Sequence, residues 1–66
     1  MIVNGRPLEL ATGETVIAVL RHLGLEADAR GVAVAIDGEV LPRACWETFA
    51  LPPDARIEVL SAMQGG

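Results

Sequence analysis

The first hydrophobic positions of the chain form two short runs on either side of a turn signal. Residues 1–3 are β-prone, and leucine recurs at every second position in the segment 6–10. Asn4-Gly5 lies between the two runs, and this pair readily adopts the positive φ values that a two-residue hairpin loop requires. The pattern predicts an N-terminal β-hairpin.

The next segment has the spacing of a helix. The apolar residues at positions i, i+3, i+4 and i+7 are Val16, Val19, Leu20 and Leu23. Thr15 is placed to be the N-cap, and Gly24 stands where a left-handed residue ends many helices. Arg21 and His22 fall in the last turn, where positive charge suits the helix dipole. A helix of about eight or nine residues is unstable alone, so we expect it to form against a sheet.

The segment 32–36, VAVAI, predicts a strand that is apolar on both faces. We therefore expect it to be covered on both sides or to lie beside a partner. Asp37-Gly38 is a second two-residue hairpin signal, and the strand that follows, residues 39–41, ends before Pro42.

The last third of the chain predicts a short turn and a final strand. The segment 43–49 is expected to be irregular or 3₁₀, with Trp46 and Phe49 closing one end of the core. Residues 56–62 alternate, so that Ile57 and Val59 share one face while Glu58, Leu60 and Ala62 share the other.

The resulting order is ββ-α-ββ-β, which predicts an α+β domain with one helix laid across a small mixed sheet. We place this domain at residues 1–62 and a flexible C-terminal Gly-Gly tail at 63–66.

Composition narrows the functional classes. The chain is 52% hydrophobic but only 3% aromatic, which indicates an aliphatic core. A single cysteine excludes an internal disulfide, and no set of residues has the spacing of a zinc site, so we expect no metal. A net charge of −4 without a basic stripe argues against nucleic-acid binding. No stretch has the length of a membrane span and no signal region is evident, so we expect a soluble, cytoplasmic protein.

The chain shows no catalytic constellation. Cys45 and His22 are the only nucleophile-and-base pair of the cysteine type, and nothing in the sequence brings them together. We interpret Cys45 as a half-buried packing residue beside Trp46 and His22 as a surface residue. The carboxylates are scattered and the glycines isolated, so we predict neither an acid–base pair nor a phosphate loop.

The end of the sequence, SAMQGG, carries the strongest chemical signal. Gly65 and Gly66 have no structural purpose after a strand that ends near Ala62. Residues without a side chain allow a thin segment to enter a narrow channel, where catalytic groups can approach the carboxylate of Gly66. A carboxylate becomes an electrophile only after a leaving group is attached, for example by adenylation with ATP. Because the chain has no ATP site, a separate enzyme must carry out that step.

With these features the chain resembles the ThiS family, the sulfur carriers of thiamin biosynthesis, which have the ubiquitin-like β-grasp fold. The resemblance runs through the stretches VNGRPLEL, GETVIAVLRHLGL, GVAVAIDGEVLPRACW and RIEVLSAMQGG. Two departures are Asp37, where Asn is common, and a Pro-Pro-Asp connector in place of the usual Gly-Asp turn; neither affects the predicted fold or tail.

The resemblance implies a protein co-substrate rather than an enzyme. An E1-like adenylyltransferase of the ThiF type would adenylate Gly66 with ATP, and sulfur from cysteine, delivered by a cysteine desulfurase or sulfurtransferase, would convert it to a thiocarboxylate. Thiazole synthase of the ThiG type would then take the sulfur. The resemblance implies no bound cofactor, and it places Gly65, Gln64 and Met63 in the tail that enters the partner active sites.

Partner docking does not follow from the resemblance residue by residue. Because one helix can cover only one side of the sheet, we expect docking on the opposite face, at Ala33, Ala35, Leu60 and Ala62.

Three alternatives remain open from the sequence. The carrier can serve another route, such as molybdopterin synthesis or a thiolation pathway. The chain can instead be a ubiquitin-like modifier conjugated through Gly66, or an interaction domain whose two final glycines are fortuitous.

Overall fold

The computed structural model describes residues 1–28 and 30–61, which form one helix, one 3₁₀ turn and five strands. In chain order the elements are β1 (Ile2–Val3), β2 (Arg6–Pro7), α1 (Val16–His22), β3 (Val32–Ile36), β4 (Glu39–Val40), the 3₁₀ turn η1 (Arg43–Cys45) and β5 (Arg56–Ser61). The predicted order ββ-α-ββ-β is therefore confirmed.

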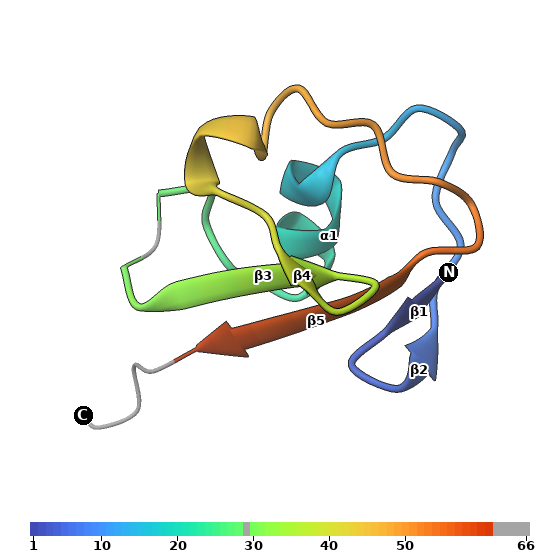
Figure 1. Ribbon diagram of the computed structural model, residues 1–66, viewed down its shortest axis with the longest axis horizontal. Coiled ribbons are helices and arrows are strands. Elements are labelled where there is room, and N and C mark those ends of the chain that lie inside the picture. Colours follow the sequence, from blue (N-terminus) through green and yellow to red (C-terminus); the bar gives the residue numbers. More distant parts are fainter. Residues whose placement is uncertain (29, 62–66) are drawn as a thin grey trace.

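The five strands form one mixed sheet in the order β2-β1-β5-β3-β4 (Figure 1). The last strand in the sequence, β5, lies in the middle, parallel to β1 and antiparallel to β3. The two hairpins β1–β2 and β3–β4 form the outer parts of the sheet. This arrangement is the β-grasp-like α+β fold that the resemblance implies.

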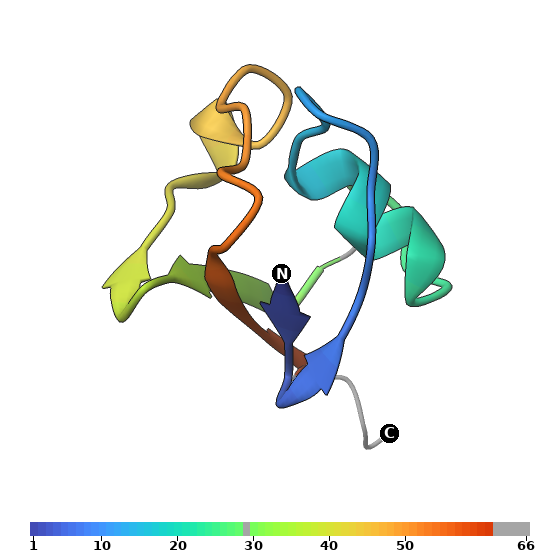
Figure 2. The same ribbon diagram turned by 90° about the vertical axis from the view of Figure 1, so that its right-hand side faces the viewer.

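The helix α1 covers one face of the sheet, and the core lies between them (Figure 2). Among the predicted inward residues, Val16, Leu20 and Ile57 are fully buried. The full set of buried hydrophobic residues is Val3, Val16, Val19, Leu20, Val34, Ile36, Trp46, Leu51, Ala55, Ile57 and Val59. No polar or charged residue is buried in the described part of the chain, so hydrophobic packing alone holds this core.

Both predicted hairpin turns are present. Asn4 and Gly5 have φ values of 53° and 83°, and Asp37 and Gly38 have values of 51° and 86°. The strands beside the turns are shorter than predicted, because β2 contains only residues 6–7 and β4 only residues 39–40. Backbone bonds extend each pairing: the N–H of Leu8 donates to Met1 and the amino terminus of Met1 donates to Leu8, while the N–H of Leu41 donates to Val34.

At the C-terminal end of α1, the residue that packs against the core differs from the predicted one. The N–H of Gly24, with φ 80°, donates to Arg21, and that of Leu25 donates to Leu20 at 2.8 Å, which together form a Schellman cap. The reversal at Gly24 turns Leu25 back toward the core, whereas Leu23 is 40% exposed. The prediction that Leu23 belongs to the buried helix face was wrong. Thr15 is the N-cap residue as predicted, but its side chain makes no capping hydrogen bond.

In the segment after β4, a second core residue differs from the predicted one. Trp46 is 2% exposed and closes one end of the core as predicted, whereas Phe49 is 40% exposed. Leu51 takes the expected place of Phe49 in the core, because its N–H donates to the carbonyl of Glu14 at 2.8 Å. That bond ties the connector to the segment before α1 and directs the Leu51 side chain inward.

Candidate functional site

The strand that precedes the tail is the best-held strand of the sheet. β5 pairs with β3 along five residues, from Ile36↔Ile57 to Val32↔Ser61, and with β1 at Ile2↔Arg56 and Val3↔Ile57. Ser61 is the last described residue of this strand. The predicted tail residues, together with one predicted docking residue, lie outside the described part of the chain; they are Ala62, Met63, Gln64, Gly65 and Gly66.

On one side of β5, the turn residue Asn4 continues the pairing that β1 begins. Its backbone N–H donates to the carbonyl of Ile57 at 2.9 Å, and its side-chain Oδ1 accepts from the N–H of Val59 at 2.8 Å. The backbone at Asn4 turns away with positive φ, so the side-chain oxygen supplies the acceptor that the backbone carbonyl of Asn4 would supply in a longer parallel strand.

Asp37 does the same on the other side of β5. Its backbone N–H donates to the carbonyl of Arg56 at 2.8 Å, and its Oδ1 accepts from the N–H of Arg56 at 3.0 Å. Asn4 and Asp37 are the only non-glycine residues with positive φ in the described ranges 1–28 and 30–61. The first residue of each hairpin loop therefore both forms the turn and holds the central strand. The sequence pattern located these turns but did not show where the side chains would bond.

The face of the sheet opposite α1 carries the three described residues of the predicted docking face. Ala33 pairs with Leu60, and Ala35 pairs with both Glu58 and Val40, and such directly paired residues point to the same side of a sheet. We call Ala33, Ala35, Val40, Glu58 and Leu60 the open sheet face. Leu60 is 69% exposed and Val40 is 75% exposed, so no other part of the described chain covers them. The expectation that β3 would be covered on both faces is not met within this single chain.

Val40 belongs to this face although the sequence analysis did not include it. Its neighbour Glu39 pairs with the buried residue Ile36, which places Val40 on the opposite side beside Ala35. The alternation of Glu39 and Val40 was a usable signal, but the face it indicates depends on the pairing register.

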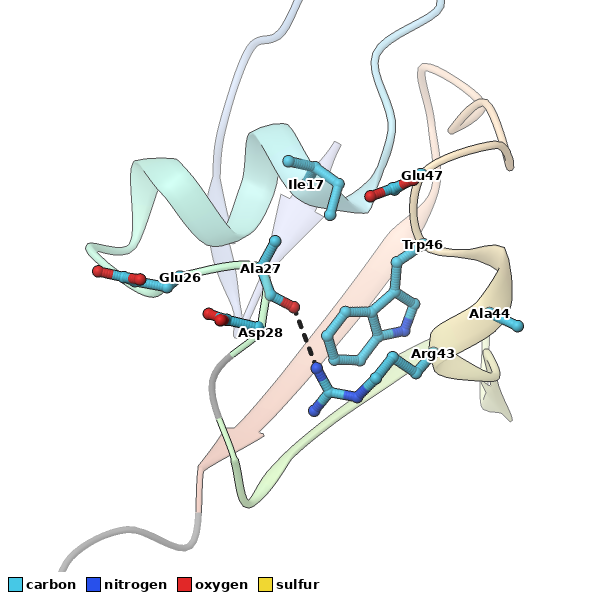
Figure 3. Close-up of a pocket in the computed structure, with 8 residues that line it drawn as sticks. All are labelled: Ile17, Glu26, Ala27, Asp28, Arg43, Ala44, Trp46 and Glu47. Carbon is cyan, nitrogen blue, oxygen red and sulfur yellow. Dashed lines mark hydrogen bonds between the residues drawn. The ribbon is translucent and has the colours of Figure 1, made fainter.

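A hollow of about 540 Å³ lies at the end of the core that Trp46 closes (Figure 3). The Trp46 Nε1–H donates to the carbonyl of Leu41 at 3.1 Å, and the Arg43 guanidinium lies 4.3 Å from the centre of the indole ring. Arg43 Nη1 also donates to the carbonyl of Ala27 at 3.0 Å, so it holds the loop after α1 against the tryptophan. Glu26 and Asp28, from the loop after α1, and Glu47, from the segment after η1, line the same hollow.

The structure does not bring Cys45 and His22 together. Cys45 is half-buried in η1, as predicted, and His22 is exposed at the end of α1. Figure 2 shows η1 and this end of the helix on different sides of the molecule. His22 instead lines a hollow beside the β1–β2 hairpin, where it is accompanied by Asn4 and Arg6.

Residues 1–28 and 30–61 offer no support for metal binding or for membrane insertion. No group of three or more His, Cys, Asp or Glu side chains in these ranges is arranged to hold a metal ion. No helix there is long and apolar enough to cross a bilayer. The main candidate features of the described residues are thus a firmly held central strand and the exposed, largely apolar sheet face beside it.

Comparison with known proteins connects this geometry to a family. The sequence model of the ThiS family matches residues 1–66. A crystal structure of the thiamine biosynthesis protein ThiS from Geobacter metallireducens is similar with a TM-score of 0.75 and 33% identity, over 98% of this chain and 96% of that one. A solution NMR structure of a thiamine biosynthesis protein from the same organism gives a TM-score of 0.74 and 30% identity, over 98% and 85% of the two chains. A comparison with curated proteins gave no match. The match along all 66 residues, together with the shared fold, shows that the chain belongs to the ThiS family.

Proposed function

We propose that this protein is a sulfur carrier of thiamin biosynthesis and that the carboxylate of Gly66 carries the sulfur. The observation that carries the proposal is the family match over residues 1–66, a range that includes the terminal Gly65-Gly66. The two similar structures are named as thiamine biosynthesis proteins, which favours this route over molybdopterin synthesis or another thiolation pathway.

The proposed chemistry activates the carboxylate of Gly66 with ATP and then transfers sulfur to its carbon atom. A carboxylate oxygen of Gly66 attacks the α-phosphorus of ATP, which releases pyrophosphate and leaves an acyl adenylate. A cysteine-derived sulfur nucleophile then attacks the carbonyl carbon, and AMP leaves with the electron pair of the broken C–O bond. Where the nucleophile is a persulfide on the sulfur-donor enzyme, this attack forms an acyl disulfide, and a thiol reductant then cleaves its S–S bond to release the thiocarboxylate. Thiazole synthase takes the sulfur from that thiocarboxylate.

In this proposal the chain is a co-substrate, and its partners provide the catalysis. The partners are an E1-like adenylyltransferase, a sulfurtransferase or cysteine desulfurase, and thiazole synthase, and they act in the cytoplasm. ATP and the sulfur donor belong to these enzymes, and the carrier holds no cofactor of its own. The folded body then has one task, which is to bind each partner so that Gly66 reaches the active site.

The open sheet face is the proposed docking surface for these partners. It places Leu60 on the same strand as the tail, one residue before the end of β5, so binding there sets where the tail begins. Exposed aliphatic side chains at a protein surface favour a protein partner, because their burial removes apolar area from water. Glycine residues lose conformational freedom when they enter a partner, and docking of the body offsets that cost.

Reconstitution with defined components tests the proposal. The purified chain is incubated with ThiF-type adenylyltransferase, ATP, cysteine and a desulfurase, and its intact mass is measured. We expect an adenylate without the sulfur source and a thiocarboxylate with it, and neither product for a variant that lacks Gly66. Failure of the unaltered chain to form either product contradicts the proposal.

A genetic experiment tests the pathway separately. Deletion of the gene should produce a requirement for thiamin that added thiazole relieves. If deletion instead abolishes a molybdenum-cofactor activity, or if Gly66-dependent protein adducts appear in lysate, the carrier serves another route or the chain is a protein modifier.

A further inference from the structure

On the side of β5 that faces β1, the first backbone groups of the strand are hydrogen-bonded and, among the described residues, the last ones are not. Ile57 and Val59 direct their backbone groups toward β1 and Asn4, because the carbonyl of Ile57 and the N–H of Val59 both bond to Asn4. Arg56 bonds to Asp37 on the opposite side, as expected when successive residues point their backbone groups in opposite directions. The same alternation directs the N–H of Ser61 and the carbonyl of Val59 toward the β1 side.

No described residue pairs with these two groups. β1 contains only Ile2–Val3, and the chain turns away at Asn4-Gly5, so the C-terminal half of β5 extends past the hairpin (Figure 1). A side chain added at Gly5 would meet no atom within 4 Å, so the described chain leaves space around this turn. Half of the central strand is therefore a sheet edge, and this edge lies directly before the tail.

The edge adjoins a hollow of about 500 Å³ whose charge differs from that of the whole chain. Asn4, which bonds to Val59, is also part of the lining. Arg6 and His22 provide basic groups there, whereas Pro7, Leu8 and Leu23 provide apolar surface, and no carboxylate is among the lining residues. A net charge of −4 for the chain makes this locally basic surface distinctive.

We infer that the edge formed by Val59 and Ser61 pairs with an extended segment of the adenylating partner. The inference rests on the proposed function and names the binding mode for one of its steps. The segment accepts a hydrogen bond from the N–H of Ser61, donates one to the carbonyl of Val59, and places an acidic side chain and an apolar side chain in the hollow with Arg6 and Leu23. Strand addition of this kind gives affinity through main-chain bonds, and side-chain pockets give specificity. It fixes the direction of the tail at its base, which docking on the sheet face alone does not do.

A second copy of this chain is a less suitable occupant. Two copies of the chain, each with a net charge of −4, repel each other. Sedimentation of the free protein distinguishes the occupants: a monomer is expected, and a dimer that Ser61→Pro dissociates would overturn the assignment to the enzyme.

Amide hydrogen exchange tests the pairing directly, with ATP omitted so that no chemistry occurs. In the free protein the Ser61 amide should exchange fast, and the Leu60 amide, which faces β3, should exchange slowly. Addition of ThiF-type adenylyltransferase should slow exchange at Ser61 at least tenfold and leave Leu60 slow. Equal exchange at Ser61 with and without the enzyme overturns the inference.

Two substitutions at one position provide the functional test. Ser61→Pro removes the N–H, and proline suits an edge position after a residue that is already extended. Ser61→Ala keeps the N–H and removes only the hydroxyl group. Ser61→Pro should unfold at the same temperature as the original chain and form adenylate with a KM raised about tenfold, the loss expected from one main-chain hydrogen bond. Ser61→Ala should behave as the original chain.

Two charge-reversal variants, one in the basic hollow and one outside it, test the contribution of the hollow. Arg6→Glu should weaken binding about tenfold or more, as repulsion from an acidic segment predicts. Arg21→Glu makes the same change in net charge on a different surface of the helix and should have a smaller effect. If Ser61→Pro and Arg6→Glu are adenylated as well as the original chain, the inferred strand pairing is refuted. The carrier function is not refuted by that result. An original chain that is never adenylated refutes the carrier function itself.

Discussion

The side chain of Asn4 bonds to the backbone of Val59, 55 positions later in the sequence, with a distance of 2.8 Å between Oδ1 and N. This contact joins the first turn of the protein to the strand that carries the tail. Asp37 bonds to Arg56 in the same manner from the other hairpin, so the central strand is held from both sides by loop residues. Stability of the hairpin turns and placement of the tail are consequently linked.

Asn4→Ala should lower the free energy of unfolding by about 2–3 kcal/mol. The loss combines an unpaired, partly buried N–H at Val59 with the cost of a left-handed backbone at alanine, which lacks the polar side chain that lets asparagine tolerate this conformation. Urea unfolding followed by circular dichroism measures it.

Two other substitutions separate the contributions at Asn4. Asn4→Asp keeps an acceptor and should lose the least, whereas Asn4→Gly keeps the turn and should lose about 1–2 kcal/mol. Equal losses for Ala and Gly would show that the positive φ contributes nothing measurable.

Trp46→Phe should destabilise the domain although the core stays apolar. The substitution leaves the carbonyl of Leu41 without its indole donor, removes part of the surface under Arg43, and should cost about 1–3 kcal/mol. Trp46→Ala should cost about 3–5 kcal/mol, a large part of the total stability of a domain this small. Circular dichroism is the suitable probe, because the chain contains one tryptophan and both variants lose its fluorescence.

Charge on the open sheet face should impair partner binding without affecting the fold. Leu60→Glu and Val40→Glu alter side chains that are more than two-thirds exposed, so the unfolding temperature should change little. Each should lower kcat/KM for adenylation about tenfold or more, because a carboxylate is then buried against the partner. Thr48→Glu adds the same charge at an exposed position outside this face and is the matched control. Equal activity of all three variants would remove the face from the docking surface.

Cys45→Ser should leave sulfur transfer unchanged. Cys45 is half-buried in η1, and the proposed chemistry assigns it no step. Intact mass should show the same rate of thiocarboxylate formation for the variant and the original chain. A loss of sulfur transfer at normal adenylation would assign Cys45 a part in the sulfur relay.

Local patterns in the sequence were sufficient for the elements and their order. Asn-Gly and Asp-Gly identified both hairpin turns, because positive φ is a property of the residues themselves. The spacing of Val16, Val19 and Leu20 identified the buried helix face for the same reason, since a helix brings these residues together wherever it packs. Gly65-Gly66 likewise indicated the proposed reactive end without reference to the fold.

The tertiary structure alone decided which residues meet across long separations. The parallel pairing of β1 with β5 determines that Asn4 reaches Val59, and no local pattern encodes that register. The same holds for Leu25 and Leu51, which occupy core positions predicted for Leu23 and Phe49, because single backbone bonds to Leu20 and Glu14 orient them. Turn and helix signals depend on near neighbours, whereas burial, register and open edges depend on contacts that exist only after the chain has folded.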